Sequence, residues 1–172
     1  MADEVSREER LNALRKNSRV VADLRSLNKK VKNPFGVMEL PKFNDMLPHF
    51  RDSLLSGVDI SKGFWTLKVH ESCQEAFAFF FNGRHYTWVS LPMGFVLAAQ
   101  IFSASVRSIY SKEAFQIHQK QHREIQHLAY NRTFKIYLDD INFANAPWFY
   151  KDHYHLWVFV LKQSRKYGVK LH

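Results

Sequence analysis

The fold of this chain is constrained most by one stretch, residues 134–143, which reads Phe-Lys-Ile-Tyr-Leu-Asp-Asp-Ile-Asn-Phe. Its apolar residues first alternate with Lys135 and Tyr137, which is the period of a half-buried strand. Asp139 and Asp140 follow where a tight turn is expected, and the alternation then restarts. The stretch therefore predicts a β-hairpin with two acids at its tip.

The two adjacent carboxylates allow two interpretations. Like charges side by side repel each other, so a fold that keeps both ionised usually places a cation beside them. Oxygen ligands suit a hard ion such as Mg²⁺. Asp-Asp is also favourable turn chemistry without any ion. Taken alone, the pair does not decide for a metal site over a simple turn.

Four segments resemble motifs of the reverse transcriptases, and they occur in the order found in that family. Tyr-Leu-Asp-Asp at 137–140 resembles the Tyr-x-Asp-Asp box. Residues 58–65, Val-Asp-Ile-Ser-Lys-Gly-Phe-Trp, resemble the first palm motif, and Leu-Pro-Met-Gly-Phe at 91–95 with Phe102 is similar to the next one. Residues 19–28 resemble the fingers segment. The chain looks most like the enzymes of LTR retrotransposons of the Ty3/gypsy type, or of retroviruses.

The resemblance implies an α+β fold, with an antiparallel palm sheet packed on helices. It divides the chain into fingers at approximately 1–53, palm at 54–76, a fingers hairpin at 77–90, and palm again at 91–172. Relatives continue beyond this point into a thumb, so the resemblance implies a C-terminally truncated domain in which the thumb is absent.

Local patterns predict the individual elements. Asn-Gly at 82–83 is the turn preferred between two strands, and apolar spacings of three and four residues indicate a helix after Gly94. The predicted elements are a helix over 6–17, a strand over 19–27, a turn at 33–36, a short helix over 41–51, strands over 54–60 and 65–70, a hairpin over 75–89, helices over 94–110, 111–129 and 150–167, and the start of a strand at 169–171.

The resemblance assigns Asp59, Asp139 and Asp140 to two Mg²⁺ ions, with the backbone carbonyl of Ile60 as a further ligand and Mn²⁺ as a possible substitute. Two such ions, ~3.5–4 Å apart, serve both ends of a nucleotidyl transfer. Asp59 lies far from the other acids in the sequence, but strand pairing can join them. A strand-end cap is the alternative role for Asp59.

The resemblance also assigns four residues to the incoming nucleotide. Phe64 packs under its sugar and excludes a 2′-hydroxyl, unless it is simply a core phenylalanine. Arg19 grips the triphosphate with its guanidinium, for which a solvated basic face is the alternative. Met93 and Tyr137 lie beside the nucleotide.

Charge and cysteine content bound the partners and the compartment. Twenty-five Lys and Arg residues against 16 Asp and Glu residues give a net charge of +9. This excess suits a nucleic acid, although a basic protein without such a partner is not excluded. Cys73, the single cysteine, excludes an internal disulfide and suits a reducing compartment, which indicates an intracellular protein, cytoplasmic or nuclear. No apolar run approaches the ~18–20 residues of a transmembrane helix.

Nine histidines raise the question of zinc. His70-x-x-Cys73 and His153-x-His155 are the nearest approximations to ligand pairs. Structural zinc usually requires paired thiolates or a Cys₂His₂ set, so a single cysteine argues against it. His118 and His122 are predicted to lie on a solvated helix face.

These observations predict an RNA-directed DNA polymerase domain, a nucleotidyltransferase that joins dNTPs to a primer 3′-hydroxyl. Its partners would be an RNA or DNA template-primer, dNTPs and the remaining Pol segments, the thumb and RNase H. The alternative is a catalytically weak or inactive retroelement remnant that acts as a basic nucleic-acid- or protein-binding module. A two-metal nuclease uses similar carboxylates, but Phe64 and the 91–94 motif argue against it.

Overall fold

The computed structural model describes residues 21–38 and 43–172. The helix predicted over 6–17 and the predicted triphosphate ligand Arg19 lie outside these residues. Within the described ranges, no helix is both long enough and apolar enough to cross a bilayer.

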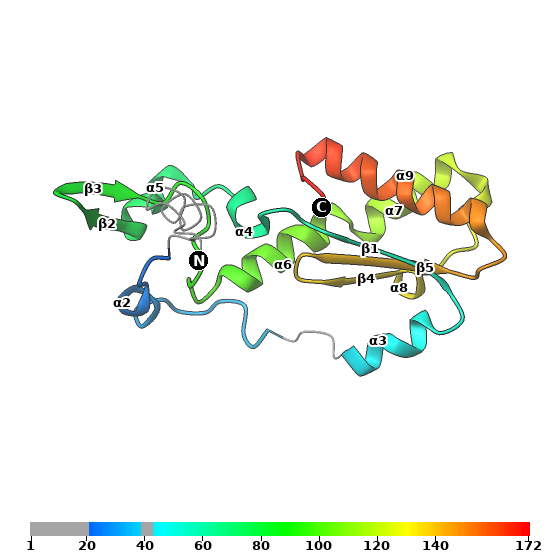
Figure 1. Ribbon diagram of the computed structural model, residues 1–172, viewed down its shortest axis with the longest axis horizontal. Helices are drawn as coiled ribbons and strands as arrows, with labels where there is room; N and C mark the ends of the chain where they lie inside the picture. Colours follow the sequence, from blue (N-terminus) through cyan, green and yellow to red (C-terminus); the bar gives the residue numbers. More distant parts are fainter. Residues whose placement is uncertain (1–20, 39–42) are drawn as a thin grey trace, which may run out of the picture.

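The described chain forms two unequal groups of elements (Figure 1). The larger group holds a three-stranded antiparallel sheet of order β1-β5-β4, and the smaller holds the two-stranded hairpin β2-β3. This α+β architecture with antiparallel sheets confirms the predicted fold class. The strands are β1 (Leu54–Asp59), β2 (Ala78–Phe81), β3 (Arg84–Thr87), β4 (Phe134–Tyr137) and β5 (Asp140–Asn145).

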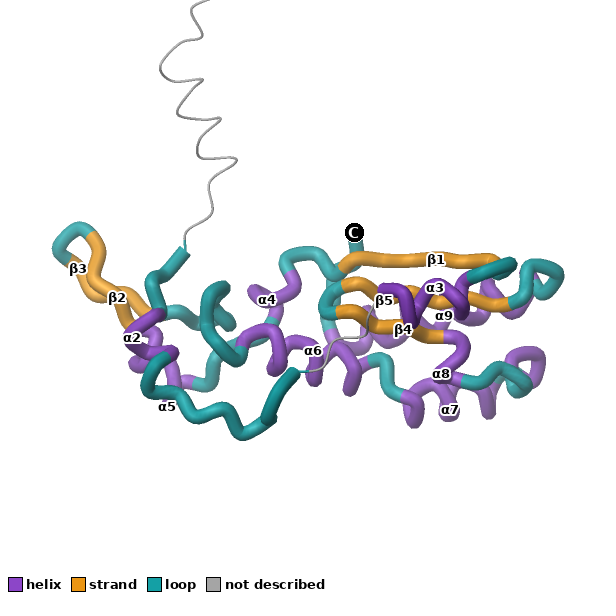
Figure 2. Tube along the Cα trace, turned by 90° about the horizontal axis from the view of Figure 1, so that it is seen from below, coloured by secondary structure: helices purple, strands orange, loops and turns teal. Residues whose placement is uncertain are grey.

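Helices connect the strands and cover the larger sheet (Figure 2). The long ones are α6 (Ala98–Ile109), α7 (Lys112–Gln121) and α9 (Tyr150–Tyr167), together with the shorter α3 (Phe43–Phe50). The others are single turns: α2 (Arg25–Asn28), α4 (Gly63–Thr66), α5 (Glu71–Gln74), η1 (Glu75–Phe77), η2 (Arg123–Ile125) and α8 (Tyr130–Thr133).

The two faces of the larger sheet differ in chemistry. Ile141 of β5 pairs with Val58 of β1 and with Ile136 of β4, and all three side chains are buried. They join one hydrophobic core with residues of α6 and α9. Because side chains alternate along a strand, Asp59 and Asp140 lie on the opposite face. The apolar face therefore anchors the sheet, and the polar face stays free for chemistry.

Aromatic rings fill the core between the sheet and the helices. Phe115 of α7, Phe134 of β4 and Phe159 of α9 lie within 5.1–5.4 Å of one another, measured between ring centroids, in edge-to-face arrangements. The hydroxyl groups of Tyr110 and Ser164, which are buried, are hydrogen-bonded at 2.8 Å. The three rings join α7 and α9 to the sheet, and the hydrogen bond joins the end of α6 to α9.

Several predicted elements are confirmed. Helix α9 begins and ends where the sequence predicted, and Gly168 beyond it has φ = 66°, the left-handed conformation that favours glycine. Asn82 and Gly83 both have positive φ, as a type I′ hairpin turn requires. Helix α3 matches the short helix predicted over 41–51 within its described residues.

Two predicted strands are wrong. Residues 25–28 form a helical turn because the Asp23 carboxylate accepts a hydrogen bond from the Arg25 backbone N–H at 3.2 Å, which competes with strand pairing. Residues 63–66 are also helical, and the segment after them pairs only through the Lys68–Ser90 bridge.

Two predicted helices are shorter than expected. Helix α6 begins at Ala98, beyond Gly94, whose φ of 91° is not helical. The helix predicted over 111–129 ends at Gln121. There the Gln119 side-chain amide donates to the carbonyls of Ile125 and Leu128, at 2.7 and 2.9 Å, and folds the following chain into a separate turn.

Gly63 allows α4 to contact α6 closely. A Cβ at Gly63 would lie 2.7 Å from the ring of Phe102, which is only 2% exposed and cannot move aside. Gly63→Ala should lower the free energy of unfolding by about 1–3 kcal/mol through overpacking, as measured by urea denaturation. Ser108→Ala, at an exposed position of α6, is the control. Equal stability of Gly63→Ala and the wild type would contradict the contact.

Candidate active site

Strand pairing brings together the three predicted acids. Asp59, the last residue of β1, pairs with Asp140, the first residue of β5. Asp139 lies in the two-residue loop before Asp140, and its carbonyl accepts a hydrogen bond from the Ile60 N–H at 3.1 Å. The β4–β5 turn therefore meets the end of β1 (Figure 1). The separation of 80 residues between Asp59 and Asp139 in the sequence is closed by one antiparallel pairing.

The site is electrostatically unbalanced. Partial burial raises the pKa of Asp140, and the neighbouring charges of Asp139 and then Asp59 raise it further. No Lys or Arg of the described residues forms an ion pair with any of these carboxylates. A divalent cation would relieve this repulsion, and carboxylate oxygens are the ligands that Mg²⁺ prefers. The donor set therefore fits the predicted ions.

The turn that carries the acids is strained. Leu138 has φ = 53°, the left-handed conformation that a residue with a Cβ adopts at a cost of roughly 1–2 kcal/mol. Strain of this kind persists only where the surroundings hold it, and it is concentrated at functional sites. Here the paired strands β4 and β5 hold it from both sides.

The backbone of β1 is held on its other edge as well. Ser61 N–H donates to the Lys170 carbonyl, and His172 N–H donates to the Asp59 carbonyl, both at 2.8 Å. Leu171 forms a bridge with Ile60, so the strand start predicted at 169–171 is reduced to this single bridge. Asp59 and Ile60 are thus fixed between two neighbours.

The residues predicted to contact the nucleotide lie in different surroundings. Tyr137 pairs with Asp140 and is half-buried on the polar face of the sheet. Phe64 is half-buried at the border of the core and packs its ring on Phe102, with 5.0 Å between centroids. Its predicted contact with a sugar stays a prediction. Met93 is half-buried in the loop before α6.

Sequence reasoning missed a side chain that organises this loop. The Asn28 amide donates to the Gly94 carbonyl at 2.9 Å, and its oxygen accepts from the Val96 N–H at 3.0 Å. Asn28 thereby joins α2 to the loop that carries Met93. The signal was the position of Asn28 at the end of the 19–28 motif, but the role needs tertiary structure to be seen.

A second missed residue is Asn142. It lies opposite Gly57 on the polar face of the sheet, and a Cβ at Gly57 would lie 2.7 Å from the Asn142 side-chain oxygen. Gly57 therefore makes room for this amide beside the acids. Alternation along 134–143 could have placed Asn142 on the same face as Asp140.

The histidines that the sequence singled out differ in their burial and in their hydrogen-bond partners. His118 is only 5% exposed and His122 is half-buried, so the solvated face predicted for this pair is wrong. His70 caps α5, with its Nδ1 accepting from the Ser72 N–H at 3.3 Å. His153 is buried, and both its ring nitrogens have partners.

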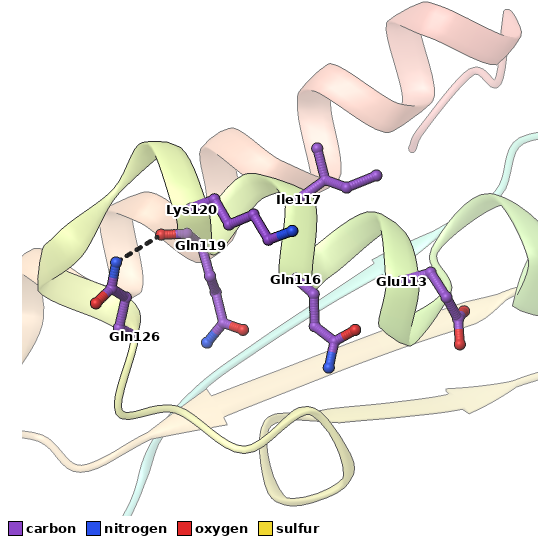
Figure 3. Close-up of a pocket in the computed structure, with 6 residues that line it drawn as sticks. All are labelled: Glu113, Gln116, Ile117, Gln119, Lys120 and Gln126. Carbon is purple, nitrogen blue, oxygen red and sulfur yellow. Dashed lines mark hydrogen bonds between the residues drawn. The ribbon is translucent and has the colours of Figure 1, made fainter.

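A surface hollow of about 490 Å³ lies on α7 (Figure 3). It is lined by side chains of α7 and of the turn after it: Glu113, Gln116, Ile117, Gln119, Lys120 and Gln126. Gln119 uses its amide to close that turn, and Gln126 donates to the Gln119 carbonyl at 3.5 Å. None of the predicted site residues lines this hollow.

Comparisons with known proteins agree with this architecture. Residues 8–172 match the family described as "Reverse transcriptase (RNA-dependent DNA polymerase)". The Gag-Pol polyprotein of Walleye dermal sarcoma virus is 30% identical over 129 residues, which cover 74% of this chain and 6% of the polyprotein. The Enzymatic polyprotein of Figwort mosaic virus is 28% identical over 134 residues, 77% of this chain and 17% of that protein. The chain thus spans less than a fifth of either relative.

Solved structures share the fold. A foamy viral protease-reverse transcriptase in complex with double-stranded DNA matches with a TM-score of 0.63 at 24% identity, over 89% of this chain and 23% of that one. The foamy viral enzyme in complex with an RNA/DNA hybrid gives 0.60 at 23% identity, over 87% and 18%. With the family match across nearly the whole sequence, this chain belongs to the reverse transcriptase family.

Proposed function

We propose that this chain is the fingers-and-palm part of an RNA-directed DNA polymerase that adds dNTPs to a primer 3′-hydroxyl. The observation that carries the proposal is the pairing of Asp59 with Asp140 beside Asp139. In this proposal the three-stranded sheet and its helices, 54–76 and 91–172, are palm. Residues 1–53 and the hairpin at 77–90 are fingers.

The three acids would hold two Mg²⁺ ions, with the carbonyl of Ile60 as a further ligand and Mn²⁺ as a substitute. Bound there, the ions would lower the pKa of the primer hydroxyl and neutralise the charge of the leaving pyrophosphate. The chain contributes position: the β1–β5 pairing and the strained turn hold the carboxylates before any ion arrives. Burial, and then the nearby charges of Asp139 and Asp59, raise the pKa of Asp140, which fits carboxylates held close together.

Phe64 would act as a wall beneath the sugar of the incoming nucleotide. Because its ring is backed by the buried ring of Phe102, it has little room to retreat from a 2′-hydroxyl. Met93 and Tyr137 would border the same nucleotide. Asn28 would position the Met93 loop through its two backbone contacts. Arg19 is proposed to contact the triphosphate from the fingers.

A primed template is the proposed partner. The net charge of +9 favours a polyanion, and two of the matching structures contain double-stranded DNA and an RNA/DNA hybrid. Further Pol segments, such as a thumb and RNase H, would complete the grip on the duplex. The exposed thiol of Cys73 suits a reducing, intracellular setting.

Primer extension on an RNA template tests the polymerase proposal. Asp139→Asn and Asp140→Asn should each reduce nucleotide incorporation at least ~100-fold with Mg²⁺ or Mn²⁺, because each removes a negative ligand oxygen. Asp52→Asn, at an exposed carboxylate, is the matched control. If the wild type binds duplex but incorporates nothing, the chain is a basic binding module and the proposal fails.

Asp140→Asn also tests the electrostatic role of the site without catalysis. In the presence of a chelator, the unfolding temperature of the variant should be about 1–2 °C higher than that of the wild type, because one repulsive charge is removed. The increase is small because solvent screens charges at a partly exposed site. Added Mg²⁺ should raise the unfolding temperature of the wild type and of Asp52→Asn, but not of this variant. Calorimetry measures both effects. A variant that Mg²⁺ stabilises as much as the wild type would remove Asp140 from the ligand set.

Substitution of Phe64 tests sugar selection. Phe64→Val should raise the efficiency of rNTP incorporation relative to dNTP incorporation at least ~10-fold, because the smaller side chain leaves room for a 2′-hydroxyl. The ratio of kcat/KM values is the measurement, since it does not depend on how much of the protein is folded. Phe80→Val, at an exposed ring of β2, should leave the ratio unchanged. An unchanged ratio in Phe64→Val would leave Phe64 with its packing role alone.

A further inference from the structure

Three histidines gather between the end of α7 and α9, in a region that the polymerase proposal does not use. His118 and His122 are four residues apart at the end of α7, and His155 projects from α9. One ring nitrogen from each lies within 4.8 Å of those of the other two. The ring centroid of His122 lies 4.3 Å from that of His118 and 4.7 Å from that of His155. Figure 1 shows α7 and α9 on the same side of the sheet.

The hydrogen bonds of this trio leave one nitrogen of each ring available. His118 Nε2 donates to the His155 backbone carbonyl at 3.1 Å, which leaves its Nδ1 with a lone pair. His122 Nε2 and His155 Nδ1 are buried and have no hydrogen-bond partner. Metal-binding histidines commonly donate their second nitrogen to a backbone carbonyl, as His118 does.

Another histidine of the same helix has a partner for each of its ring nitrogens. His153, two residues before His155, is also buried, but its Nε2 is bonded to Ser56 Oγ at 2.8 Å and its Nδ1 to Asn145 Oδ1 at 2.5 Å. At His153, which has a packing role only, the surrounding residues provide a hydrogen-bond partner for each ring nitrogen. An unsatisfied buried nitrogen costs roughly 1–3 kcal/mol, and here two of them share one location.

We propose that His118, His122 and His155 form a binding site for a transition-metal ion, Zn²⁺ above all, that links α7 to α9. Imidazole nitrogens suit Zn²⁺, whereas Mg²⁺ prefers oxygen. Three histidines supply three of four tetrahedral positions, and water can supply the fourth. At Zn–N distances of about 2.0–2.1 Å, the nitrogens close to ~3.4 Å apart, which rotation of the half-buried His122 and His155 can provide.

The pKa values of two of these histidines favour metal binding over proton binding. Burial, and then the charge of His122, lower the pKa of His118 to about 4. Burial, and then the charges of His155 and Lys162, lower the pKa of His122. Glu124 acts in the opposite direction on His122. Neutral imidazoles are the form that binds a metal, so the lowered pKa values of His118 and His122 favour metal binding.

The ion would act as a clip behind the polymerase site. Helix α9 supplies Leu156, Phe159 and Val160 to the core beneath the sheet, and α7 supplies Phe115. The turn η2, which follows His122, also contacts α9 and adds Ile125 to the core. A metal held there would fix these segments together without touching the acids, so the inference stands independently of polymerase activity.

Zinc titration of the full chain, stripped of metal by a chelator, tests the proposal. One equivalent of Zn²⁺ should bind, measured by competition with a chromophoric chelator, and should raise the unfolding temperature by about 5–10 °C at 100 times the Kd. His122→Gln and His155→Gln should each weaken binding at least ~100-fold. They are preferred to substitution of the buried His118, which could prevent folding. Circular dichroism confirms that both variants are folded.

Three controls make the result specific. His85→Gln, at an exposed histidine of β3, should bind Zn²⁺ like the wild type. Asp139→Asn/Asp140→Asn should also retain full Zn²⁺ affinity, which separates this site from the polymerase acids. Co²⁺ in place of Zn²⁺ should give the visible absorption of a tetrahedral complex. Zinc binding that persists in His122→Gln/His155→Gln, or no stoichiometric binding by the wild type, overturns the proposal.

Discussion

The register between β1 and β5 is the constraint on which the rest of this structure depends. It pairs Asp59 with Asp140 and, one residue earlier, Val58 with Ile141, so the same hydrogen bonds position the acids and bury the core. A slip of one residue would exchange the two faces of β1, exposing Val58 and burying Asp59. Apolar burial on one face therefore enforces the geometry of the carboxylates on the other.

The same arrangement lets the fold tolerate an unfavourable site. Adjacent acids repel, and Leu138 holds a strained backbone between them and β4. Both costs are small beside the apolar surface that Phe134, Ile136 and Phe143 bury on the far side of the hairpin. The strain and the repulsion are concentrated in the few residues where a cation would bind.

The sequence predicted those parts of the fold whose signals are local. The hairpin at 134–143, the Asn82-Gly83 turn and the helix ending at Gly168 each carry their own periodicity or turn chemistry. The prediction of a strand over 65–70 was wrong because residues 63–66 form a helical turn, in which Gly63 lies close to Phe102 of α6. No local pattern encodes this contact. The three acids could be grouped only through family resemblance. The roles of Asn28 and of the histidine trio were not predicted, because the contacts are between residues far apart in the sequence. Asn28 lies 66 residues from Gly94, and His118 lies 37 residues from His155.

Residues 170–172 lie along the outer edge of β1 and help to hold the backbone of Asp59 in place. Asp59 is fixed through its main chain, with Ile60 bonded to Asp139 on one side and the Asp59 carbonyl bonded to His172 on the other. Main-chain bonds do not depend on side-chain identity. Residues on the open face, such as Lys135, Tyr137 and Asn142, can therefore be exchanged without moving the carboxylates. The side chains of the polar face can therefore vary, while the geometry of the acids is set by the strand pairing beneath them.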